Sequence, residues 1–358
     1  MPSLVAIPAT GGSRFVDRLR KTWARGDAVL PVDPRLPEAA RAALEAELRV
    51  GDDVADGDAL VVATSGTTGT PKGVVLTHAA VEASARATSA RLEVDPCTDS
   101  WLACLPLAHV GGLSVVTRAL VTGTELVVHK GFDPVAAMTS GTTLVSLVPT
   151  ALARLDSVSM FRRIVLGGSA MPDDLPANAV TTYGMTETGS GIVYDGVPLD
   201  GVTVRVDDVT GEISVAGPML VRAYRSIDGE RDPKDAEGWF PTGDVGSWDG
   251  GAQRLIVFGR RDDLVITGGE NVWPAAVEDA LRHHPGVADV AVVGRPDPEW
   301  GQILVAMVVP VRASRPPRLE DLRAVVKDVL PPWCAPKVVE IVPSLPRTNL
   351  GKLQRSRL

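Results

Sequence analysis

The sequence has few cysteines and no long apolar run, and each shortage excludes a class of protein. Its 358 residues include three cysteines, Cys97, Cys104 and Cys334, whose spacings fit no metal site. A small, odd number does not suggest a disulfide framework, so we expect reduced thiols in a reducing compartment. No apolar run reaches the roughly 18 residues that a membrane span needs. The first 13 residues lack the charged and then apolar order of a signal peptide. We therefore expect a cytoplasmic enzyme.

An excess of positive charge is also missing. The formal net charge is −8 and the pI is about 5.2, whereas a chain whose main partner is a nucleic acid is usually basic. Hydrophobic residues make up 45% of the chain, which is ordinary for a globular protein. A chain of this length can bury a large core and predicts about two domains.

Apolar runs alternate with helical patterns through the first half of the chain. The spacing predicts helices over 15–26, 36–50, 77–92 and 111–121, and strands over 28–32, 60–63, 101–105, 125–129, 143–148, 164–166 and 180–183. This alternation predicts βα units and a largely parallel sheet covered on both faces. After Pro198 the strands become short, with glycine and aspartate between them (202–206, 212–216, 255–258). Beyond Asp262 there is a compact α+β pattern, with helices over 273–283 and 319–329 and strands over 287–293, 303–309 and 338–342.

A stretch rich in glycine and hydroxyl side chains comes directly after the strand predicted at 60–63. It reads Thr64-Ser65-Gly66-Thr67-Thr68-Gly69-Thr70-Pro71-Lys72-Gly73. Backbone N–H groups in such a turn form an anion-binding nest, and the lysine adds a positive charge, so the stretch predicts a polyphosphate site. The ordinary P-loop needs a Ser or Thr directly after Gly-Lys, and here Gly73 takes that place. The alternative interpretation is a flexible linker.

Another motif, Tyr183-Gly184-Met185-Thr186-Glu187-Thr188, lies at the end of the strand predicted at 180–183. A ring beside glycine can stack on a purine, Thr186 can donate to a phosphate, and Glu187 suits Mg²⁺, which prefers one or two carboxylates plus phosphate oxygens. The alternative is a turn with a capping Thr and Glu. Lys352, in the basic tail, likewise has two interpretations: a solvated charge, or a lysine that stabilises the charge developing on a leaving pyrophosphate.

In combination, these stretches resemble the adenylate-forming superfamily, which contains acyl- and aryl-CoA ligases, luciferases and peptide-synthetase adenylation domains. The glycine loop, Gly-Gly-Ser-Ala (167–170), Tyr-Gly-Met-Thr-Glu, Thr-Gly-Asp (242–244), Gly-Arg-Arg-Asp-Asp (259–263) and the terminal Gly-Lys occur in that superfamily's order. The resemblance covers nearly everything from residue 64 to residue 352. It implies an α/β fold, with an N-terminal ATP- and acid-binding domain (1–261) of βα-layered sheets plus a small β-rich subdomain. A small, mobile α+β C-terminal domain (262–358) would complete the chain.

The same resemblance implies a two-step reaction. A carboxylate attacks the α-phosphate of ATP to give an acyl-adenylate and pyrophosphate, and the thiol of coenzyme A then attacks the adenylate. Lys352, Thr186 and His109 would be catalytic, with Lys352 serving the first step. Asp262 would be the hinge on which the C-terminal domain turns, and Gly268 and Gly269 would line the path of the thiol.

The resemblance also assigns the nucleotide contacts. Glu187 would hold Mg²⁺, while Asp244 would accept hydrogen bonds from the ribose hydroxyls, with Arg260 as its partner. The implied nucleotide-binding positions are Thr64, Ser65, Gly66, Thr67, Thr68, Gly69, Lys72, Gly168, Ser169, Ala170, Tyr183, Gly184, Met185, Thr186, Asp244 and Arg260.

The acid is indicated by the segment Pro106 to Gly112, which resembles the acyl-pocket segment of the superfamily, and by a nearby arginine. His109 either lines this pocket or is a core histidine at a helix start. Arg118 lies nine residues later in an otherwise apolar helix, where an unpaired charge is costly. It either forms a salt bridge with an acidic residue or binds a second carboxylate on the substrate. An arginine at this spacing resembles o-succinylbenzoate–CoA ligases of menaquinone synthesis, in which Gly168 would also contact the substrate.

Two further features resemble the short actinobacterial members of that group: the stretch at 193–201, and the brief region before the phosphate loop, which is far longer in most of the superfamily. A trimmed N-terminus suggests a homodimer that covers exposed core. The nearest rival is a CoA ligase for another aryl or acyl acid. Three others are an amino-acid adenylation domain, a nucleotide-binding regulator that has lost catalysis, and a P-loop kinase.

Overall fold

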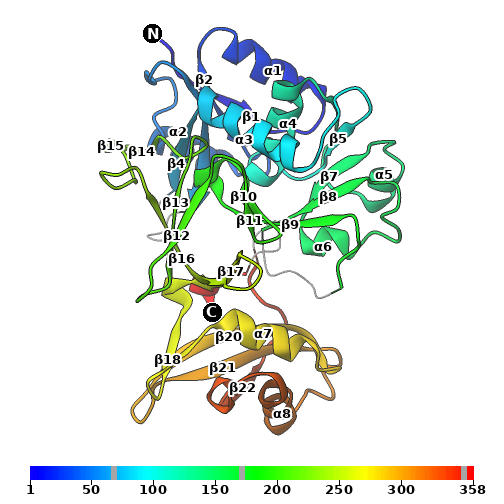
Figure 1. Cartoon of the computed structure of the whole chain (residues 1–358), viewed down its shortest axis with the longest axis vertical. Coiled ribbons are helices and arrows are strands. Elements are labelled where there is room, and N and C mark those ends of the chain that lie inside the picture. The colour runs from blue at the N-terminus through cyan, green and yellow to red at the C-terminus, as the bar shows by residue number, and fades with distance from the viewer. Residues whose placement is uncertain (66–70, 169–173, 348–352) are drawn as a thin grey trace. The chain divides into compact units, whose positions relative to one another are not determined.

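A computed structural model of the chain describes residues 1–65, 71–168, 174–347 and 353–358. Its internal packing divides the chain into two compact units (Figure 1). The first comprises Met1–Arg205, Val215–Pro241 and Gly251–Arg254, and the second comprises Val206–Ser214, Thr242–Gly250 and Leu255–Leu358. The division therefore falls within the short-stranded segment, and the domain boundary at Asp262 stays a prediction.

The first unit contains a six-stranded sheet in the order β1-β2-β3-β4-β14-β15. Strands β1 (Leu4–Pro8), β2 (Ala28–Val32) and β3 (Asp58–Ser65) run parallel, and β4 (Pro71–Thr77), β14 (Ala223–Ser226) and β15 (Gly229–Arg231) continue it in antiparallel pairs. Helices α1 (Ser13–Trp23), α2 (Glu38–Glu47) and α3 (His78–Arg91) belong to the same part of the chain. The stretch predicted to hold polyphosphate thus connects two neighbouring antiparallel strands, β3 and β4.

A seven-stranded sheet in the same unit has the order β11-β10-β9-β8-β7-β5-β6. Its parallel part confirms the predicted βα alternation and comprises β5 (Ser100–Ala103), β6 (Glu125–Val128), β7 (Leu144–Leu147), β8 (Arg163–Leu166) and β9 (Ala179–Gly184). Two antiparallel strands, β10 (Gly191–Tyr194) and β11 (Val197–Pro198), complete it. Helices α4 (Val110–Thr122), α5 (Pro134–Met138) and α6 (Pro149–Leu152) connect the parallel strands. Every residue of β5 and β7 is buried, as expected for parallel strands in the interior of a sheet that is covered on both faces.

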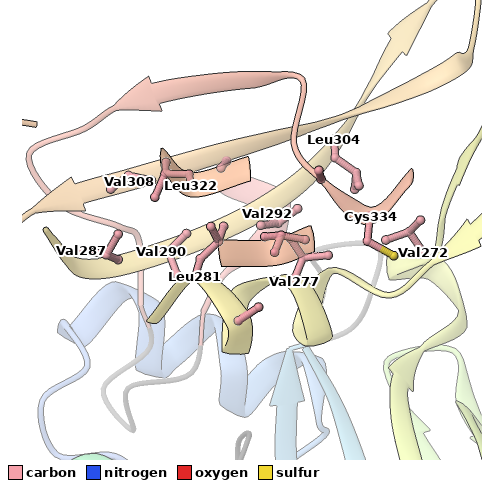
Figure 2. Close-up of a cluster of buried hydrophobic side chains, with 14 of the residues drawn as sticks. Val272, Val277, Leu281, Val287, Val290, Val292, Leu304, Val308, Leu322 and Cys334 are labelled. Carbon is pink, nitrogen blue, oxygen red and sulfur yellow. The ribbon is translucent and has the colours of Figure 1, made fainter. Parts of the chain in front are cut away.

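The remaining strands form a four-stranded and a five-stranded sheet. A four-stranded sheet has the order β12 (Thr203–Val206), β13 (Glu212–Ala216), β16 (Phe240–Asp249) and β17 (Arg254–Arg260). The five-stranded sheet of the second unit contains β18 (Val265–Thr267), β19 (Glu270–Val272), β20 (Val287–Asp297), β21 (Gly301–Pro310) and β22 (Val338–Ile341), which pairs parallel with β21. Helices α7 (Pro274–Arg282) and α8 (Leu319–Val329) pack against each other. Figure 2 shows their shared core, in which Val277 and Leu281 meet Val292, Leu304 and Leu322.

Within the described residues, no helix combines the length and the apolar character needed to cross a membrane. The three cysteines are all unpaired thiols, of which Cys97 is exposed and the other two are buried.

Candidate active site

Glycines stand at the carboxyl ends of two neighbouring parallel strands, β8 and β9, where the motifs predict the site. Gly167 and Gly168 come after β8, and Gly184 ends β9. A Cβ on Gly167 would lie 2.6 Å from Thr182 Oγ1, and one on Gly184 would lie 2.2 Å from the Ser190 carbonyl oxygen. Only glycine permits these approaches, so the pattern Gly-Gly and Tyr-Gly is required by packing as well as by any ligand. Ligands of open α/β sheets bind at such strand ends. Ser169 and Ala170 lie outside the described residues.

The turn after β9 is held by a threonine that motif reasoning did not single out. The short helix η1 (Thr186–Thr188) comes directly after the strand, and Thr188 is fully buried. The Met185 backbone N–H donates to Thr188 Oγ1 (2.9 Å), and that hydroxyl lies 2.6 Å from the Ser190 carbonyl oxygen. Thr188 therefore shapes the backbone from which Thr186 and Glu187 project.

Lys72 and Glu187 come together although Lys72 lies on β4 and Glu187 lies in η1, more than 100 residues later. Lys72 Nζ is 3.4 Å from Glu187 Oε1, and the two side chains are 34% and 12% exposed. Thr64 pairs with Lys72 across β3 and β4, and its Oγ1 donates to the Lys72 carbonyl oxygen (3.4 Å). The residues predicted to bind phosphate and Mg²⁺ are thus brought into contact. The predicted positions Gly66, Thr67, Thr68 and Gly69 lie outside the described residues.

Glu187 has the chemistry that a magnesium site requires. Its described partners, Lys72 Nζ and the hydroxyl of Tyr224 (2.8 Å), both lie on Oε1. No cluster of three or more His, Cys, Asp or Glu side chains occurs in the described part of the chain. A cation here would therefore take its other ligands from phosphate oxygens and water, which is how Mg²⁺ is usually held.

The predicted ribose-binding pair, Asp244 and Arg260, forms an ion pair within the second unit. Arg260 Nη1 is 3.3 Å from Asp244 Oδ1 and also donates to the Thr242 carbonyl oxygen. The Asp244 backbone N–H donates to Thr242 Oγ1 (3.0 Å), which bridges onward to the Ile213 carbonyl oxygen (2.7 Å). Gly243 has φ +71°, a left-handed conformation that favours glycine. The Thr-Gly-Asp segment of β16 therefore presents a carboxylate already oriented by its neighbours.

His109 is the N-cap residue of α4, and its imidazole is half-buried. Burial lowers the pKa of His109 below its usual value, while the Asp33 carboxylate raises it and Arg35 lowers it. The neutral imidazole is therefore favoured. A neutral ring at a pocket wall can contact an aryl group or donate one hydrogen bond.

Arg118 lies on α4 and is 2% exposed. Its guanidinium donates to Ser114 Oγ (3.2 Å) and Ser146 Oγ (3.3 Å) and lies 5.4 Å from the Trp101 ring centroid. Among the described residues, its Nε has no hydrogen-bond partner and no acidic side chain pairs with the guanidinium. The salt bridge that was the alternative interpretation is thus not formed there. Burial lowers the pKa of Arg118, as expected for a charge without a counter-ion.

The predicted hinge and thiol-path residues lie in the second unit. Asp262 is exposed within η2 (Arg261–Asp263). Gly268 and Gly269 form the turn between β18 and β19, with φ +59° and +86°. A Cβ on Gly268 would lie 2.8 Å from the Trp300 ring, so this turn requires glycine twice over.

Lys352 lies outside the described residues, but the chain on both sides of it is anchored. Arg347 pairs with Asp289 (2.6 Å) on one side. On the other side, Arg355 donates to Glu278 Oε2 (2.9 Å) and to the Val292 carbonyl oxygen (2.7 Å).

Comparison with known families shows where this site belongs. The family model described as AMP-binding enzyme matches residues 16–225, which is more than half of the chain. The chain belongs to the AMP-binding enzyme family. A second model, AMP-binding enzyme C-terminal domain, matches residues 276–352. The match confirms the superfamily predicted from the motif order.

Several relatives of this AMP-binding enzyme are known. It is 41% identical over 335 residues to a probable 2-succinylbenzoate–CoA ligase of Mycobacterium tuberculosis, covering 87% of this chain and 86% of the relative. The solved o-succinylbenzoate CoA synthetase of Bacillus subtilis, in complex with the acyl-adenylate intermediate OSB-AMP, is 28% identical with a TM-score of 0.87, covering 99% of this chain and 87% of the other. The same synthetase in complex with ATP and magnesium ion is 26% identical with a TM-score of 0.88, covering 99% and 89%. These likenesses confirm the predicted fold class.

Three features of this AMP-binding enzyme were not found by motif reasoning. They are the buried Thr188, the two serines that contact Arg118, and Tyr224 on β14. Sequence offers a signal for Thr188, which stands directly after the Thr-Glu pair, and for Ser114, which lies four residues before Arg118 on the same helix. Ser146 and Tyr224 reach their partners through packing and pairing between distant elements, which local spacing does not report.

Proposed function

We propose that this chain is an AMP-forming o-succinylbenzoate–CoA ligase of menaquinone biosynthesis. The observation that carries the choice of acid is Arg118, a buried guanidinium held by two serine hydroxyls and paired with no described carboxylate. A buried cation of this kind binds an anionic group of the substrate at a large advantage, because its desolvation has already occurred during folding. The names of the M. tuberculosis and B. subtilis relatives support the same acid.

The reaction has two steps. An oxygen of the succinyl carboxylate attacks the α-phosphorus of ATP, the bond to the β-phosphate breaks, and pyrophosphate leaves. The coenzyme A thiol then attacks the acyl carbon, loses its proton, and displaces AMP to leave the thioester. Arg118 holds the aryl carboxylate throughout, so that only the succinyl carboxylate is presented to the nucleotide.

Each unit carries residues that we propose as nucleotide contacts. In the first, Lys72 offers its ammonium to the phosphates, Glu187 lies beside it, and Thr186 precedes Glu187 in η1. Mg²⁺, when held by Glu187, would neutralise phosphate charge and orient the leaving pyrophosphate. In the second, Asp244 accepts from the ribose hydroxyls and Arg260 orients that carboxylate.

The C-terminal domain is proposed to serve both steps in turn. Lys352 stabilises the charge that develops as pyrophosphate leaves. The domain then turns at Asp262, and the Gly268-Gly269 turn lines the path of the coenzyme A thiol.

A coupled assay with ATP, coenzyme A and o-succinylbenzoate tests the proposal. We expect thioester and AMP to form from this diacid far faster than from a panel of monoacids. Rapid turnover of a different aryl or acyl acid, with none of the diacid, would favour the alternative, a CoA ligase for another acid. Arg118→Ala adds a sharper test, because its loss should fall on the diacid and spare a monoacid analogue. Equal losses on both would contradict the role of Arg118.

Lys352→Ala tests the assignment of the tail. It should abolish adenylate formation yet leave the reaction of supplied adenylate with coenzyme A intact. Parallel loss of both half-reactions would contradict a role confined to the first step.

A homodimer and a cytoplasmic location complete the proposal. Sedimentation velocity tests the homodimer, and cell fractionation tests the location.

A further inference from the structure

Tyr224 joins the two side chains on which the nucleotide contacts of the first unit depend. Its hydroxyl donates to Glu187 Oε1 (2.8 Å), and Lys72 Nζ lies 3.5 Å from the centroid of its ring. Lys72 Nζ is also 3.4 Å from the same carboxylate oxygen. One half-buried tyrosine therefore contacts both the predicted phosphate lysine and the predicted magnesium carboxylate.

Strand register explains how Tyr224 reaches both residues. It pairs with Val74 across β14 and β4, and Lys72 lies two residues before Val74 on the same strand. Side chains two residues apart share a face, and a diagonal neighbour across an antiparallel pair lies within reach of an aromatic ring. Glu187 is held near Tyr224 by a backbone hydrogen bond, because the Val221 N–H, three residues before Tyr224, donates to the Glu187 carbonyl oxygen (2.7 Å).

The kind of contact matters for what each partner can still do. The hydrogen bond from Tyr224 falls on Glu187 Oε1, which is also the oxygen that lies 3.4 Å from Lys72 Nζ. A carboxylate has two oxygens, so Glu187 can still offer Oε2 to a cation. A cation–π contact attracts an ammonium without using its N–H donors as a hydrogen bond would. Lys72, which has three such donors, keeps some of them for phosphate oxygens.

We infer that Tyr224 is a positioning residue for ATP bound with Mg²⁺, acting through Glu187 and Lys72. Its hydroxyl orients the Glu187 carboxylate, and its ring holds the Lys72 ammonium in place. The inference rests on the proposed function only in using ATP and Mg²⁺ as the ligands, and it does not depend on which acid is activated. A tyrosine with a merely structural role would affect all nucleotides alike.

Isothermal titration calorimetry on the full chain, without any acid, separates these two roles. The titrants are ATP with Mg²⁺, ATP with EDTA, and AMP. Tyr224→Phe keeps the ring and removes the hydrogen bond, and Tyr224→Leu removes both contacts. Tyr194→Phe is the matched control, because it deletes another phenol hydroxyl, which lies 3.2 Å from Thr88 Oγ1.

We expect Tyr224→Phe to weaken binding of ATP with Mg²⁺ about tenfold, as for loss of a hydrogen bond to a charged group. Its affinities for AMP and for ATP with EDTA should stay within about twofold of wild type. Tyr224→Leu should also weaken ATP with EDTA, because Lys72 then loses the ring. In turnover assays with the acid that the enzyme uses, the KM for ATP should rise while the KM for that acid stays constant.

Wild-type affinity of Tyr224→Phe for ATP with Mg²⁺, or an equal loss for AMP, would overturn the inference. Tyr194→Phe showing the same selective loss would also overturn it. If the wild type binds ATP with Mg²⁺ but does not use o-succinylbenzoate, the proposed function fails while these titrations still decide the role of Tyr224. A wild type that binds no ATP would overturn both.

Discussion

Replacing Arg118 by Met should remove activity on the diacid without lowering stability, which is unusual for a buried arginine. A matched control lies in the same unit. Arg225 is also a buried guanidinium, at 3% exposure, but it pairs with Glu230 (2.9 Å) and donates to the carbonyl oxygens of Leu48 and Asp53 (2.8 and 3.1 Å). The substitution Arg225→Met therefore has the same change of shape and a different loss of partners.

The contacts set the size of each effect. Burying a guanidinium costs several kcal/mol. Arg118 recovers part of this cost from two long bonds to serine hydroxyls, at about 1.5 kcal/mol each, and from the Trp101 ring, at about 1–2 kcal/mol. Arg118→Met should thus change the free energy of unfolding by roughly 0 to +2 kcal/mol, toward greater stability. Arg225→Met should lower it by about 3–5 kcal/mol, because the carbonyl oxygens of Leu48, Arg49 and Asp53 lose their donor and Glu230 keeps only its ion pair with Arg222.

Activity on the diacid should instead be lost with Arg118→Met, the variant that keeps its stability. Removing one partner of a buried charge pair costs about 2–5 kcal/mol, which is roughly a 30- to 5000-fold loss in kcat/KM for the diacid with Arg118→Met. The measurements are Tm by scanning calorimetry, where 1 kcal/mol corresponds to about 2–4 °C for a unit of this size, and initial rates on the diacid and a monoacid. If Arg118→Met destabilises the protein as much as Arg225→Met does, Arg118 has a structural counter-ion and the argument for a substrate carboxylate falls.

Two further predictions concern the tail and the thiols. Arg355→Ala should destabilise the second unit by about 3 kcal/mol, because the buried Glu278 carboxylate loses its closest cation (2.8 Å) and keeps only Arg282 at 3.8 Å. Arg318→Ala, which breaks an exposed pair, should change the free energy of unfolding of the same unit by under about 0.5 kcal/mol. Equal changes for the two variants in urea melts would refute the distinction. A thiol reagent should modify exposed Cys97 rapidly and leave Cys104 unmodified up to about pH 10, because burial raises the pKa of Cys104 to about 12. Fast modification of Cys104 in the folded chain, read by peptide mass, would contradict its burial.

Local pattern was enough to predict most of the secondary structure. The strand at 28–32 and the helix at 319–329 have the bounds expected from the sequence, and the helix expected over 36–50 is a shorter α2, which begins after Pro37. These elements depend on apolar period and on glycine and proline, which act within a few residues. Several strands were not predicted, among them β1, β4, β14 and β16. β14 and β15 form a short hairpin at one edge of their sheet, and the other pairing partner of β14, β4, is remote in the sequence.

In the candidate site, too, some features follow from local sequence and others from contacts between remote segments. Its motifs and their order can be read from the amino acids alone, because the chemistry of phosphate, magnesium and carboxylate binding demands particular side chains at short spacing. The match to the AMP-binding enzyme family confirms that order.

Which of those side chains meet depends on the three-dimensional packing. The fold places Lys72 against Glu187, sets Tyr224 beside both through strand register, and leaves Arg118 among serines with no described acid. Each of these facts depends on pairing between strands or helices that are distant in the chain. A sequence pattern records which face a residue occupies, whereas the partner on the opposing face is chosen by packing.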